Sequence, residues 1–343
     1  MPIPNQASNP VTELSIDGMA KQRPVRLTGT IRNPFAVPGM WLQGNLHNHL
    51  DRPGKPEWRS GAADHYRRMG YDFIGGMDHN QIVDLGEPAN LVIVPGAEMS
   101  SPGHLLALGI RSLPQLDKPA DPDDGMVAMI EAVKAAGGIA VLAHPFKSGY
   151  TWEALRRFCA AGLDGIEVVN SNVRGKGADS GRADQLWHNL LREGWPLLAL
   201  GNDDAHGPHE DADRSGWGGI PHIAWTGVLA EDISAQGVLD AIRAGRTYAS
   251  EGPRIKALSC TPDGKLTVRC SPCVACHFRA TGGGLGGSSV YPPDGQGVDD
   301  IFVFDFAVSG YRVRERLIVV LQDEHGRRAW TSPIQVDIDI TDR

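Results

Sequence analysis

Between residues 41 and 250, short apolar runs alternate with stretches whose apolar positions recur at helical spacing. The apolar runs have the length and composition of buried strands, so each is expected to lie inside a sheet. Such alternation favours a parallel sheet with helices packed outside it, either open or closed. The strands that this pattern predicts include Leu91–Val94, Leu105–Ile110, Gly165–Val169 and Ala224–Leu229.

Capping residues mark several of the predicted helices. Asp123 or Asp124 can cap the start of a helix over Asp124–Ala136, and the pair Gly137-Gly138 ends it. Ser234 is placed to cap the last helix of this region. The other predicted helices are Ala62–Met69, Trp152–Ala161, Ala183–Glu193 and Ser234–Ala244.

The pattern changes after Gly252-Pro253, where helical spacing disappears. Short alternating stretches separated by turn residues predict a small antiparallel β-sandwich domain over residues 253–343. Residues 1–40 contain one strand-like stretch, Val25–Ile31, and we expect them to form a lead-in that packs on the domain of residues 41–252. The alternating stretches are Lys265–Arg269, Ile301–Val308 and Arg316–Gln322.

The chain has 343 residues and a formal net charge of −8. An acidic chain is poorly suited to nucleic acid or to an anionic membrane surface, so neither is expected as a partner. The start of the sequence lacks the basic and apolar pattern of a signal peptide, and no apolar run is long enough to span a bilayer. With a low count of 5 cysteines, we expect a cytoplasmic protein, and assembly into a homo-oligomer stays open.

Four short motifs each follow an apolar run: HNH at 47–49, DH at 78–79, AHP at 143–145 and DDAH at 203–206. In parallel α/β folds the carboxyl ends of the strands form the active site. Imidazole and carboxylate groups are the usual ligands of zinc, manganese and iron. The repeated placement of such residues at strand ends therefore points to a multinuclear metal hydrolase.

Spacing within the motifs supports this interpretation. His47 and His49 are two residues apart on a strand, so their side chains point the same way, and Asp204 and His206 repeat that geometry. Glu98 ends a further strand and is placed to bridge two ions. A single His-x-His is usually incidental, and an Asp-His pair often caps a turn. The inference of a metal site therefore rests on all of the motifs taken together. The remaining histidines at strand ends are His79, His104 and His144.

These residues resemble the polymerase and histidinol phosphatase (PHP) family, whose four motifs appear here in the family's order. The resemblance spans about Trp41 to Ser250 and implies a distorted (β/α)7 barrel with two or three divalent ions of manganese, zinc or iron. It implies three ligand sets: His47, His49, Glu98 and Asp204 for one ion; Glu98, His104 and His144 for a second; and His79, His206 and an aspartate for a third.

The aspartate of the third set departs from the family's spacing. Asp51 is the best candidate, in HNHLDRPG, and Asp64 with His65 are substitutes that fall in a predicted helix. Asp203 occupies a place where the family often has a small residue, so it is expected to support the ligands and not to bind an ion.

A narrower resemblance covers GRTYASEGP at 245–253 and DEHGRRAWTSPI at 323–334. These segments look like the carbaryl-hydrolase-like branch of PHP proteins, which carry a β-sandwich after the barrel. Members of that branch are linked to phosphoesters and to aryl carbamates or esters, so the branch leaves the substrate open.

The expected reaction is hydrolysis by a metal-bridging hydroxide, because bound ions lower the pKa of water. Asp204 is then essential, and His206 or Asp78 would act as general acid. Arginine pairs well with phosphate oxygens, although a single cation near a site is more often a solvated surface charge. The candidates for substrate contact are Arg52, Lys147, Asn170 and Arg174, and Glu167 is either a further ligand or a supporting group.

Three functions fit these residues. The first is hydrolysis of small-molecule phosphate mono- or diesters, and the second is hydrolysis of an aryl carbamate or carboxylic ester on the same ions. The third is a non-catalytic binding protein stabilised by metal, which the intact ligand sets disfavour. An ordinary amidohydrolase usually has a bridging lysine at the end of a mid-barrel strand, and no lysine precedes a ligand histidine in this way.

The segment RCSPCVACH adds a second group of ligand-type residues, in the predicted β-domain. CVACH matches the attachment pattern of a c-type haem, and Cys270, Cys273 and Cys276 with His277 or Cys260 would suit zinc. Adjacent residues on a strand point to opposite faces, so Cys276 and His277 should diverge. We therefore favour ordinary thiols.

Overall fold

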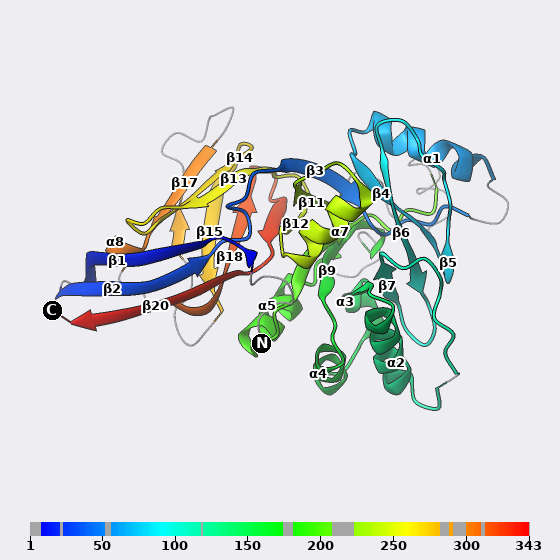
Figure 1. Ribbon diagram of the computed structural model, residues 1–343, viewed down its shortest axis with the longest axis horizontal. Coiled ribbons are helices and arrows are strands. Elements are labelled where there is room, and N and C mark those ends of the chain that lie inside the picture. The colour runs from blue at the N-terminus through cyan, green and yellow to red at the C-terminus, as the bar shows by residue number, and fades with distance from the viewer. Residues whose placement is uncertain are drawn as a thin grey trace.

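The structure is a computed structural model in which two parts lie side by side, a β-rich part and a mixed α/β part (Figure 1). Among the described helices, none combines the length and the apolar character that a membrane span requires. The structure describes residues 8–20, 23–51, 56–117, 119–173, 181–207, 223–281, 288–290, 300–309 and 313–342.

One curved sheet forms the α/β part. Strand β7 runs antiparallel to both of its neighbours, as does β11, while the remaining long strands share one direction. The carboxyl ends of those strands therefore meet at one edge. The order by hydrogen bonding is β12 (Thr247–Ser250), β11 (Trp225–Ala230), β3 (Met40–Asn45), β4 (Phe73–Asp78), β6 (Val92–Met99), β7 (Leu105–Leu108), β8 (Ile139–Leu142), β9 (Gly165–Asn170) and β10 (Leu198–Asn202), and β5 (Gln81–Ile82) pairs with the end of β4.

The two end strands of this sheet, β10 and β12, lie against each other. The Thr247 hydroxyl of β12 donates to the carbonyl of Ala199 (3.2 Å), and the Thr226 hydroxyl of the adjacent β11 donates to the carbonyl of Gly201 (2.8 Å). Within the described ranges no hydrogen-bonded ladder joins β10 to β12, and several connections carry no helix. The fold is thus confirmed as mixed α/β, whereas the closed (β/α)7 barrel is not.

The helices begin at local capping signals. Asp121 accepts from the N–H groups of Asp123 and Asp124, so α2 starts two residues earlier than predicted, with Pro122 in its first turn. Thr151 and Ser234 cap α4 and α7 through their hydroxyl groups. The described helices of this part are α1 (Pro56–Arg68), α2 (Pro122–Ala135), α3 (Pro145–Ser148), α4 (Trp152–Ala160), η2 (Ser171–Val173), α5 (Asp184–Arg192) and α7 (Ala235–Arg243).

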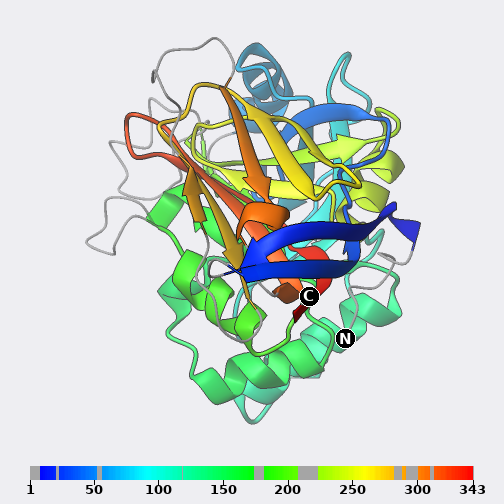
Figure 2. The same cartoon turned by 90° about the vertical axis from the view of Figure 1, so that its left-hand side faces the viewer.

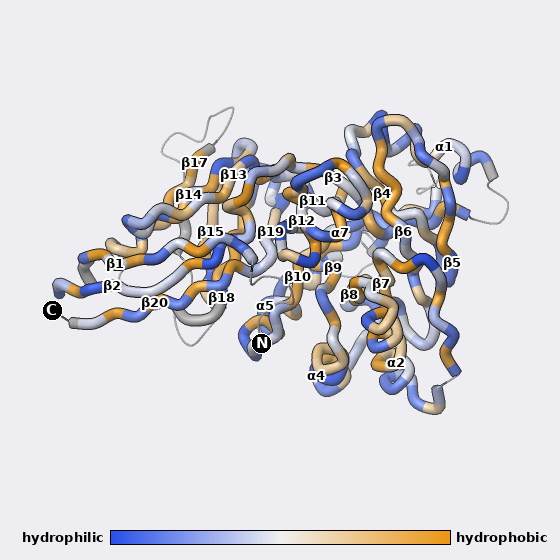
Figure 3. Tube along the Cα trace, viewed as in Figure 1, coloured by the Kyte–Doolittle hydropathy of each residue, from blue (hydrophilic) through white to orange (hydrophobic). Residues whose placement is uncertain are grey.

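The strands β4, β8, β9 and β10 are buried along their whole length. Strands covered on both faces read as continuous apolar runs, which is why the sequence shows no alternation there. Apolar positions accordingly follow these strands and the inner sides of the helices (Figure 3). Phe158 of α4 and Trp187 of α5 pack against Ile166 and Val168 of β9 in one core.

Two antiparallel sheets form the β-rich part and confirm the antiparallel prediction. A small sheet of β13 (Ile255–Cys260), β14 (Lys265–Cys270) and β17 (Asp300–Asp305) faces the larger sheet. Val268 and Phe302 of the small sheet share a core with Phe278 and Leu317 of the large one. The large sheet contains β15 (Ala275–Ala280), β16 (Ser288–Val290), β18 (Val313–Gln322), β19 (Arg328–Thr331) and β20 (Ile334–Asp342), and α8 (Phe306–Ser309) follows β17.

The N-terminal segment belongs with this β-rich part. It forms a hairpin of β1 (Val11–Ala20) and β2 (Arg23–Arg32), and β2 pairs along its length with β20. The turned view shows the hairpin lying across the β-rich part (Figure 2). Strand β2 thus takes the open edge of β20, which offers a complete row of backbone partners. The segment also contacts residues 41–252, since the Asn9 amide donates to the carbonyl of Ala244 (2.9 Å) and Leu27 shares a core with Tyr248.

Strands β12 and β19 join the two parts. They pair antiparallel from Tyr248 opposite Thr331 to Ser250 opposite Ala329. Trp330 of β19 consequently lies in the same core as Phe158 and Trp187. The β-rich part thus meets the α/β part beside the carboxyl end of β12. The boundaries at residues 40 and 252 stay a prediction.

Candidate metal centre

The predicted ligands come together at the carboxyl ends of the strands. Imidazole and carboxylate atoms of these residues form four overlapping groups in which all ligand atoms lie within 4.8 Å of one another. Most of the side chains are buried, while His79 is exposed and His104 and His206 are partly exposed. The groups are His47, His49 and Asp204; His47, Glu98 and His144; His79, Glu98 and His104; and His49, His79 and His206.

The first group surrounds the carboxylate of Asp204. His49 Nε2 lies 2.9 Å and His47 Nε2 lies 3.3 Å from Asp204 Oδ1. The same two nitrogens lie 3.5 Å and 3.3 Å from the oxygens of Glu98. These four side chains are the set that the family resemblance implies for one ion.

Glu98 stands between the groups. Its Oε1 lies 2.5 Å from His104 Nδ1 and 3.3 Å from His144 Nε2, and its Oε2 lies 2.7 Å from His79 Nδ1. One carboxylate with an oxygen toward each neighbouring set is the arrangement that bridges two ions. The side chain is buried, with 1% of its surface exposed.

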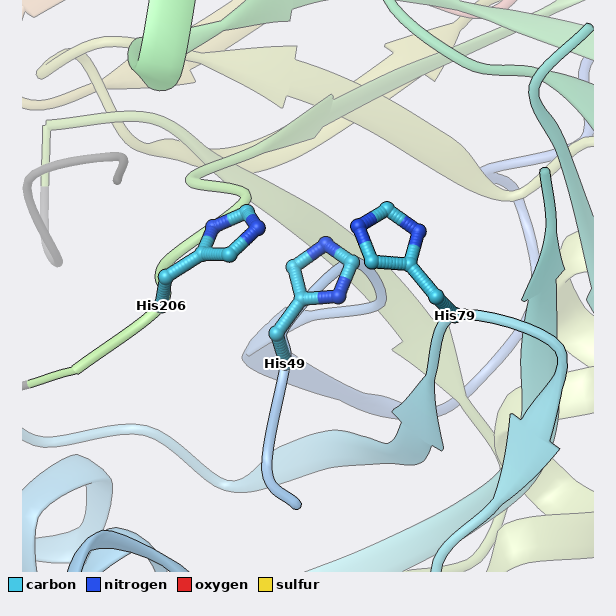
Figure 4. Close-up of side chains that lie close together, drawn as sticks. All are labelled: His49, His79 and His206. Carbon is cyan, nitrogen blue, oxygen red and sulfur yellow. The ribbon is translucent and has the colours of Figure 1, made fainter. Parts of the chain in front are cut away.

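The third set differs from the expectation. His49 lies between His79 and His206, with ring centres 4.1 Å and 3.8 Å away (Figure 4). Asp51 is absent from the groups of converging ligand atoms found among the described residues. Its carboxylate instead lies 3.2 Å from Arg59 and accepts a 2.7 Å hydrogen bond from Gln81.

The two substitutes for Asp51 also face elsewhere. Asp64 lies on the exposed side of α1, where it pairs with Arg67 at 3.0 Å. His65 packs edge-on against Trp58. Helix α1 turns both side chains away from the histidines, so Glu98 is the carboxylate that lies nearest to His79.

The residues fit divalent ions by their unsatisfied atoms as well as by their chemistry. His47 Nε2 and Glu98 Oε2 are buried and have no hydrogen-bond partner within the described part of the chain, because their short contacts to neighbouring ligand atoms lack hydrogen-bond geometry. Buried polar atoms are normally paired, and each unpaired one is costly. An ion held between these atoms would satisfy both, and neutral imidazole with carboxylate is the donor set of zinc, manganese and iron.

The same cluster shifts the pKa values of its members. Burial lowers the pKa of His49, but hydrogen bonds to Asp204 and Asp78 outweigh it and raise this pKa to about 9. The pKa of His47 is shifted in the same direction. Burial lowers this pKa, but the charges of Asp204, Glu167 and Glu98 raise it well above the usual value. The site thus attracts positive charge strongly, and without an ion protons supply that charge.

His206 is shifted the other way. Burial, followed by the charge of His49, lowers the pKa of His206 to about 4. The imidazole is then neutral at pH 7, which is the form that binds a metal. This state suits the predicted ligand role better than the predicted role of proton donor.

Backbone strain occurs at two of the candidate ligands. His144 has φ 25° and Asp204 has φ 53°, in the left-handed region that L-residues rarely adopt. Such strain concentrates at functional sites, where surrounding contacts hold it. Beside Asp204, the carboxylate of Asp203 accepts from the N–H of Ala205 (3.1 Å) and from the hydroxyl of Tyr66 (3.0 Å). Asp203 therefore supports the ligand turn, as expected.

Glu167 orients His47. One of its oxygens lies 2.8 Å from His47 Nδ1, which directs Nε2 toward Glu98 and Asp204. The other accepts from the N–H of His144 (2.6 Å). A carboxylate behind a ligand histidine fixes its tautomer and orientation, so Glu167 takes the supporting role and not that of a ligand.

The side chain of Asn170 is engaged in hydrogen bonds within the protein. Its amide donates to Glu167 (2.8 Å) and its carbonyl oxygen accepts from the N–H of Asn172 (2.9 Å), within a buried cluster. These bonds give Asn170 a supporting role, and the substrate contact expected there stays a prediction. Arg52 and Arg174, which were predicted to contact substrate, lie outside the described residues.

Asp78 supports its neighbours. Its carboxylate lies 3.2 Å from His49 Nδ1 and accepts from the N–H groups of Asp51 (2.6 Å) and His79 (2.7 Å). Burial raises the pKa of Asp78, but these contacts outweigh burial and lower the pKa below its usual value. An ionised carboxylate cannot donate a proton, so the geometry favours positioning of His49 over the predicted role as general acid.

Sequence reasoning missed several supporting side chains. Asn172 donates to Asp204 Oδ2 (2.9 Å), Asn202 donates to Glu167 (2.9 Å), and the Ser100 hydroxyl lies 2.6 Å from His79 Nδ1. Each of them ends or follows a strand. Polar residues at those positions, next to the ligand motifs, were the available signal.

A cleft of about 430 Å³ opens beside this centre. His104 and His144 line it, together with Lys147, Tyr150 and Asp123. Lys147 is exposed, and no carboxylate among the described residues lies within ion-pair distance of it. The structure therefore brings Lys147, predicted as a substrate contact, to a cavity that two candidate ligands share.

The cysteine cluster brings no metal site together. Cys270, Cys273 and Cys276 are buried, and no cysteine forms a disulfide. None of the converging ligand groups found in the described segments includes a cysteine. The interpretation of ordinary thiols stays a prediction.

Comparison with known proteins finds similarity among solved structures. No family model matches the chain, and no curated protein matches it. A solved structure from Bacteroides vulgatus ATCC 8482, described as a two-domain protein containing a predicted PHP-like metal-dependent phosphoesterase, is similar to it. The identity is 17%, the match covers 84% of this chain and 93% of that chain, and the TM-score is 0.44. At this level the similarity carries no conclusion about the activity of this chain.

Proposed function

We propose that the protein is a metal-dependent hydrolase of small-molecule phosphate mono- or diesters, with at least two divalent ions. The observation that carries this proposal is the position of Glu98, buried between two sets of imidazoles with an oxygen toward each. A purely structural ion needs a closed set of ligands around one centre. Overlapping sets that share one carboxylate, beside an open cleft, are suited to catalysis.

The residues divide the work between them. Bound ions would supply Lewis acidity and lower the pKa of a water molecule. Glu98 and Asp204 hold the negative charge that such ions require. Glu167 and Asp78 keep His47 and His49 turned toward the centre.

The cleft favours an anionic substrate. Lys147 places a positive charge beside His104 and His144, where the oxygens of a phosphate group would need it. Asp123 also lines the cleft, but it lies in the first turn of α2, where the helix dipole holds its charge. A phosphoester therefore fits better than a neutral ester.

Hydrolysis of an aryl carbamate or carboxylic ester is the second candidate. Tyr150 and Pro102 give the same cleft an apolar wall on which an aryl group could pack. Lys147→Met separates the two candidates. It should lower turnover of a phosphoester and leave turnover of a neutral aryl ester unchanged.

The direct test is turnover by manganese-loaded protein on an aryl phosphate monoester, an aryl phosphodiester and an aryl carboxylic ester. Asp204→Asn should reduce phosphate turnover by about 10³-fold or more, because metal-assisted charge stabilisation is worth several kcal/mol. Asp64→Asn, an exposed carboxylate on α1, is the matched control and should behave as wild type. Turnover of the carboxylic ester alone would replace the proposal by the second candidate. If the metal-loaded protein turns over none of the three substrates, a non-catalytic binding protein would be favoured.

A further inference from the structure

A second cavity, of about 370 Å³, lies where the β-rich part meets the end of β12. Three loops line it: the segment after β12, the turn between β14 and β15, and the hairpin between β18 and β19. Their residues around the cavity include Gly252, Arg254, Ser271, Cys273, Asp323 and Arg327. No residue of the metal centre is among those that line it.

The cavity opens at the same end of the sheet as the metal centre. β12 runs parallel to β3, so its carboxyl end points the same way as the end that carries His47 and His49. Arg254 lies over the ring of Trp225, with 5.6 Å from Cζ to the ring centre. Trp225 in turn packs in one core with Leu50, which follows His49.

Uncommitted guanidinium groups dominate the polar lining. Arg254 has no carboxylate partner within the part of the chain that the structure describes. Among the described residues, Arg327 contacts a carboxylate through Nε alone, which donates to Asp323 Oδ2 (2.7 Å). The Nη atoms of both arginines therefore remain available to a ligand.

Of the two acidic residues of the lining, Asp323 is hydrogen-bonded and Glu324 is largely exposed to solvent. Asp323 is 6% exposed and also accepts from the N–H groups of His325 and Arg327, both at 3.0 Å. The side chain of Glu324 is 77% exposed and lies 3.6 Å from His325 Nε2. Neither carboxylate therefore neutralises the charge of Arg254.

A glycine permits this arrangement. A Cβ atom at Gly252 would lie 2.7 Å from Arg327 Nε. The guanidinium of Arg327 can approach the backbone after β12 only because no side chain stands there. The hairpin and the segment after β12 are thereby fitted to each other around the cavity.

We propose that this cavity binds a small anion, a phosphate, sulfate or carboxylate group, between Arg254 and Arg327. Planar guanidinium groups form paired hydrogen bonds with such oxygens. The Ser271 side chain is a further polar group of the lining. The site is separate from the metal centre and does not depend on the proposed hydrolase activity.

The test is calorimetric titration of the metal-loaded full chain with sulfate. Arg254→Gln and Arg327→Gln should each weaken binding about tenfold or more, since one charge-assisted hydrogen bond contributes that much. Arg269→Gln, an exposed arginine on the small sheet, is the control and should bind sulfate as wild type does. Asp204→Asn should also leave sulfate binding unchanged, because it alters only the metal centre.

Equal sulfate affinity in wild type and in both arginine variants would overturn the proposal. So would loss of sulfate binding in Asp204→Asn, since the anion would then sit at the metals. Gly252→Ala provides a second test if Arg327→Gln disturbs the hairpin. It keeps both arginines, yet its new methyl group displaces Arg327, and sulfate binding should weaken.

The anion has two possible sources, a distal group of the substrate or a free ion in solution. The substrate used is an aryl phosphate that carries a second anionic group. If sulfate inhibits its turnover in wild type but not in Arg254→Gln, the cavity binds the distal group of the substrate. Sulfate that binds without competing assigns it to a free ion. The proposal of an anion site rests on the titration in both cases.

Discussion

Two regions of this protein are rich in metal-ligand residue types, and only one assembles them. At the strand ends of the α/β part, residues as distant as His47 and Asp204 approach within 3.3 Å. In the β-rich part, Cys270, Cys273, Cys276 and His277 lie within eight consecutive residues but form no group of ligand atoms in the described chain.

Strand direction explains the difference. Parallel strands deliver their last side chains to one edge, so remote residues meet there. Cys270 ends β14 in the small sheet, whereas Cys276 lies on β15 in the large sheet. Cys276 is buried in the core and its neighbour His277 is partly exposed, because successive side chains alternate between faces. Density along the sequence therefore says less about a site than the position of each residue on its strand.

Glu167→Gln should have the largest effect among the supporting residues. It weakens the group behind His47 and should lower metal affinity about 10–100-fold, as loss of an outer carboxylate does. Competition with a chelating dye measures this affinity. Equal affinity in wild type and variant would mean that His47 needs no orientation by Glu167.

Metal affinity should also rise with pH. An ion needs His49 neutral, and the metal-free protein keeps its proton up to a pKa of about 9. Binding at pH 7–8 should therefore release at least one proton, and affinity should increase by up to about tenfold per pH unit for each proton, levelling off above pH 9. Calorimetry in buffers of different ionisation enthalpy counts the released protons. Binding without proton release would contradict the charged state inferred for His49.

Tyr66→Phe tests the contacts beneath the ligand turn. It removes the hydroxyl that donates to Asp203 at 3.0 Å in a buried cluster. Loss of one partner of a buried polar group costs about 1–3 kcal/mol. The free energy of unfolding, measured by thermal and denaturant unfolding, should fall by that amount. Unchanged stability would show that Asp203 is satisfied without Tyr66.

Cys273→Ser should have the smallest effect on metal content, namely none. The cysteine is buried and forms no disulfide, and it belongs to no group of ligand atoms in the described residues. Elemental analysis of wild type and variant, purified side by side, measures the ions per chain. A loss of one ion in the variant would give the β-rich part a metal site and remove the contrast between the two regions.

Much of the metal centre could be predicted from local sequence. Most ligands directly end or follow an apolar run, and a parallel sheet gathers such ends, so Glu98, His144 and Asp204 could be assigned together. His104 instead precedes β7, which runs antiparallel to its neighbours. Asp51 could not be judged in this way, because the path of the chain after His49 decides where its carboxylate points.

The pairing of strands that are distant in the sequence could not be predicted either, because it also depends on the path of the chain. The pattern of β2 predicts a strand through Val25, Leu27 and Ile31, but nothing local names β20 as its partner. The supporting amides Asn172 and Asn202 were likewise invisible, because asparagine after a strand is also the ordinary residue of a turn.

The most direct test of the metal centre is the number of ions per chain in wild type and in Glu98→Gln, after loading with manganese or zinc and extensive dialysis. If Glu98 bridges two ions, wild type should retain at least two per chain, and the variant should lose at least one while keeping its fold by circular dichroism. Fewer than one ion per wild-type chain, or the same content in both proteins, would contradict a shared metal centre built on Glu98.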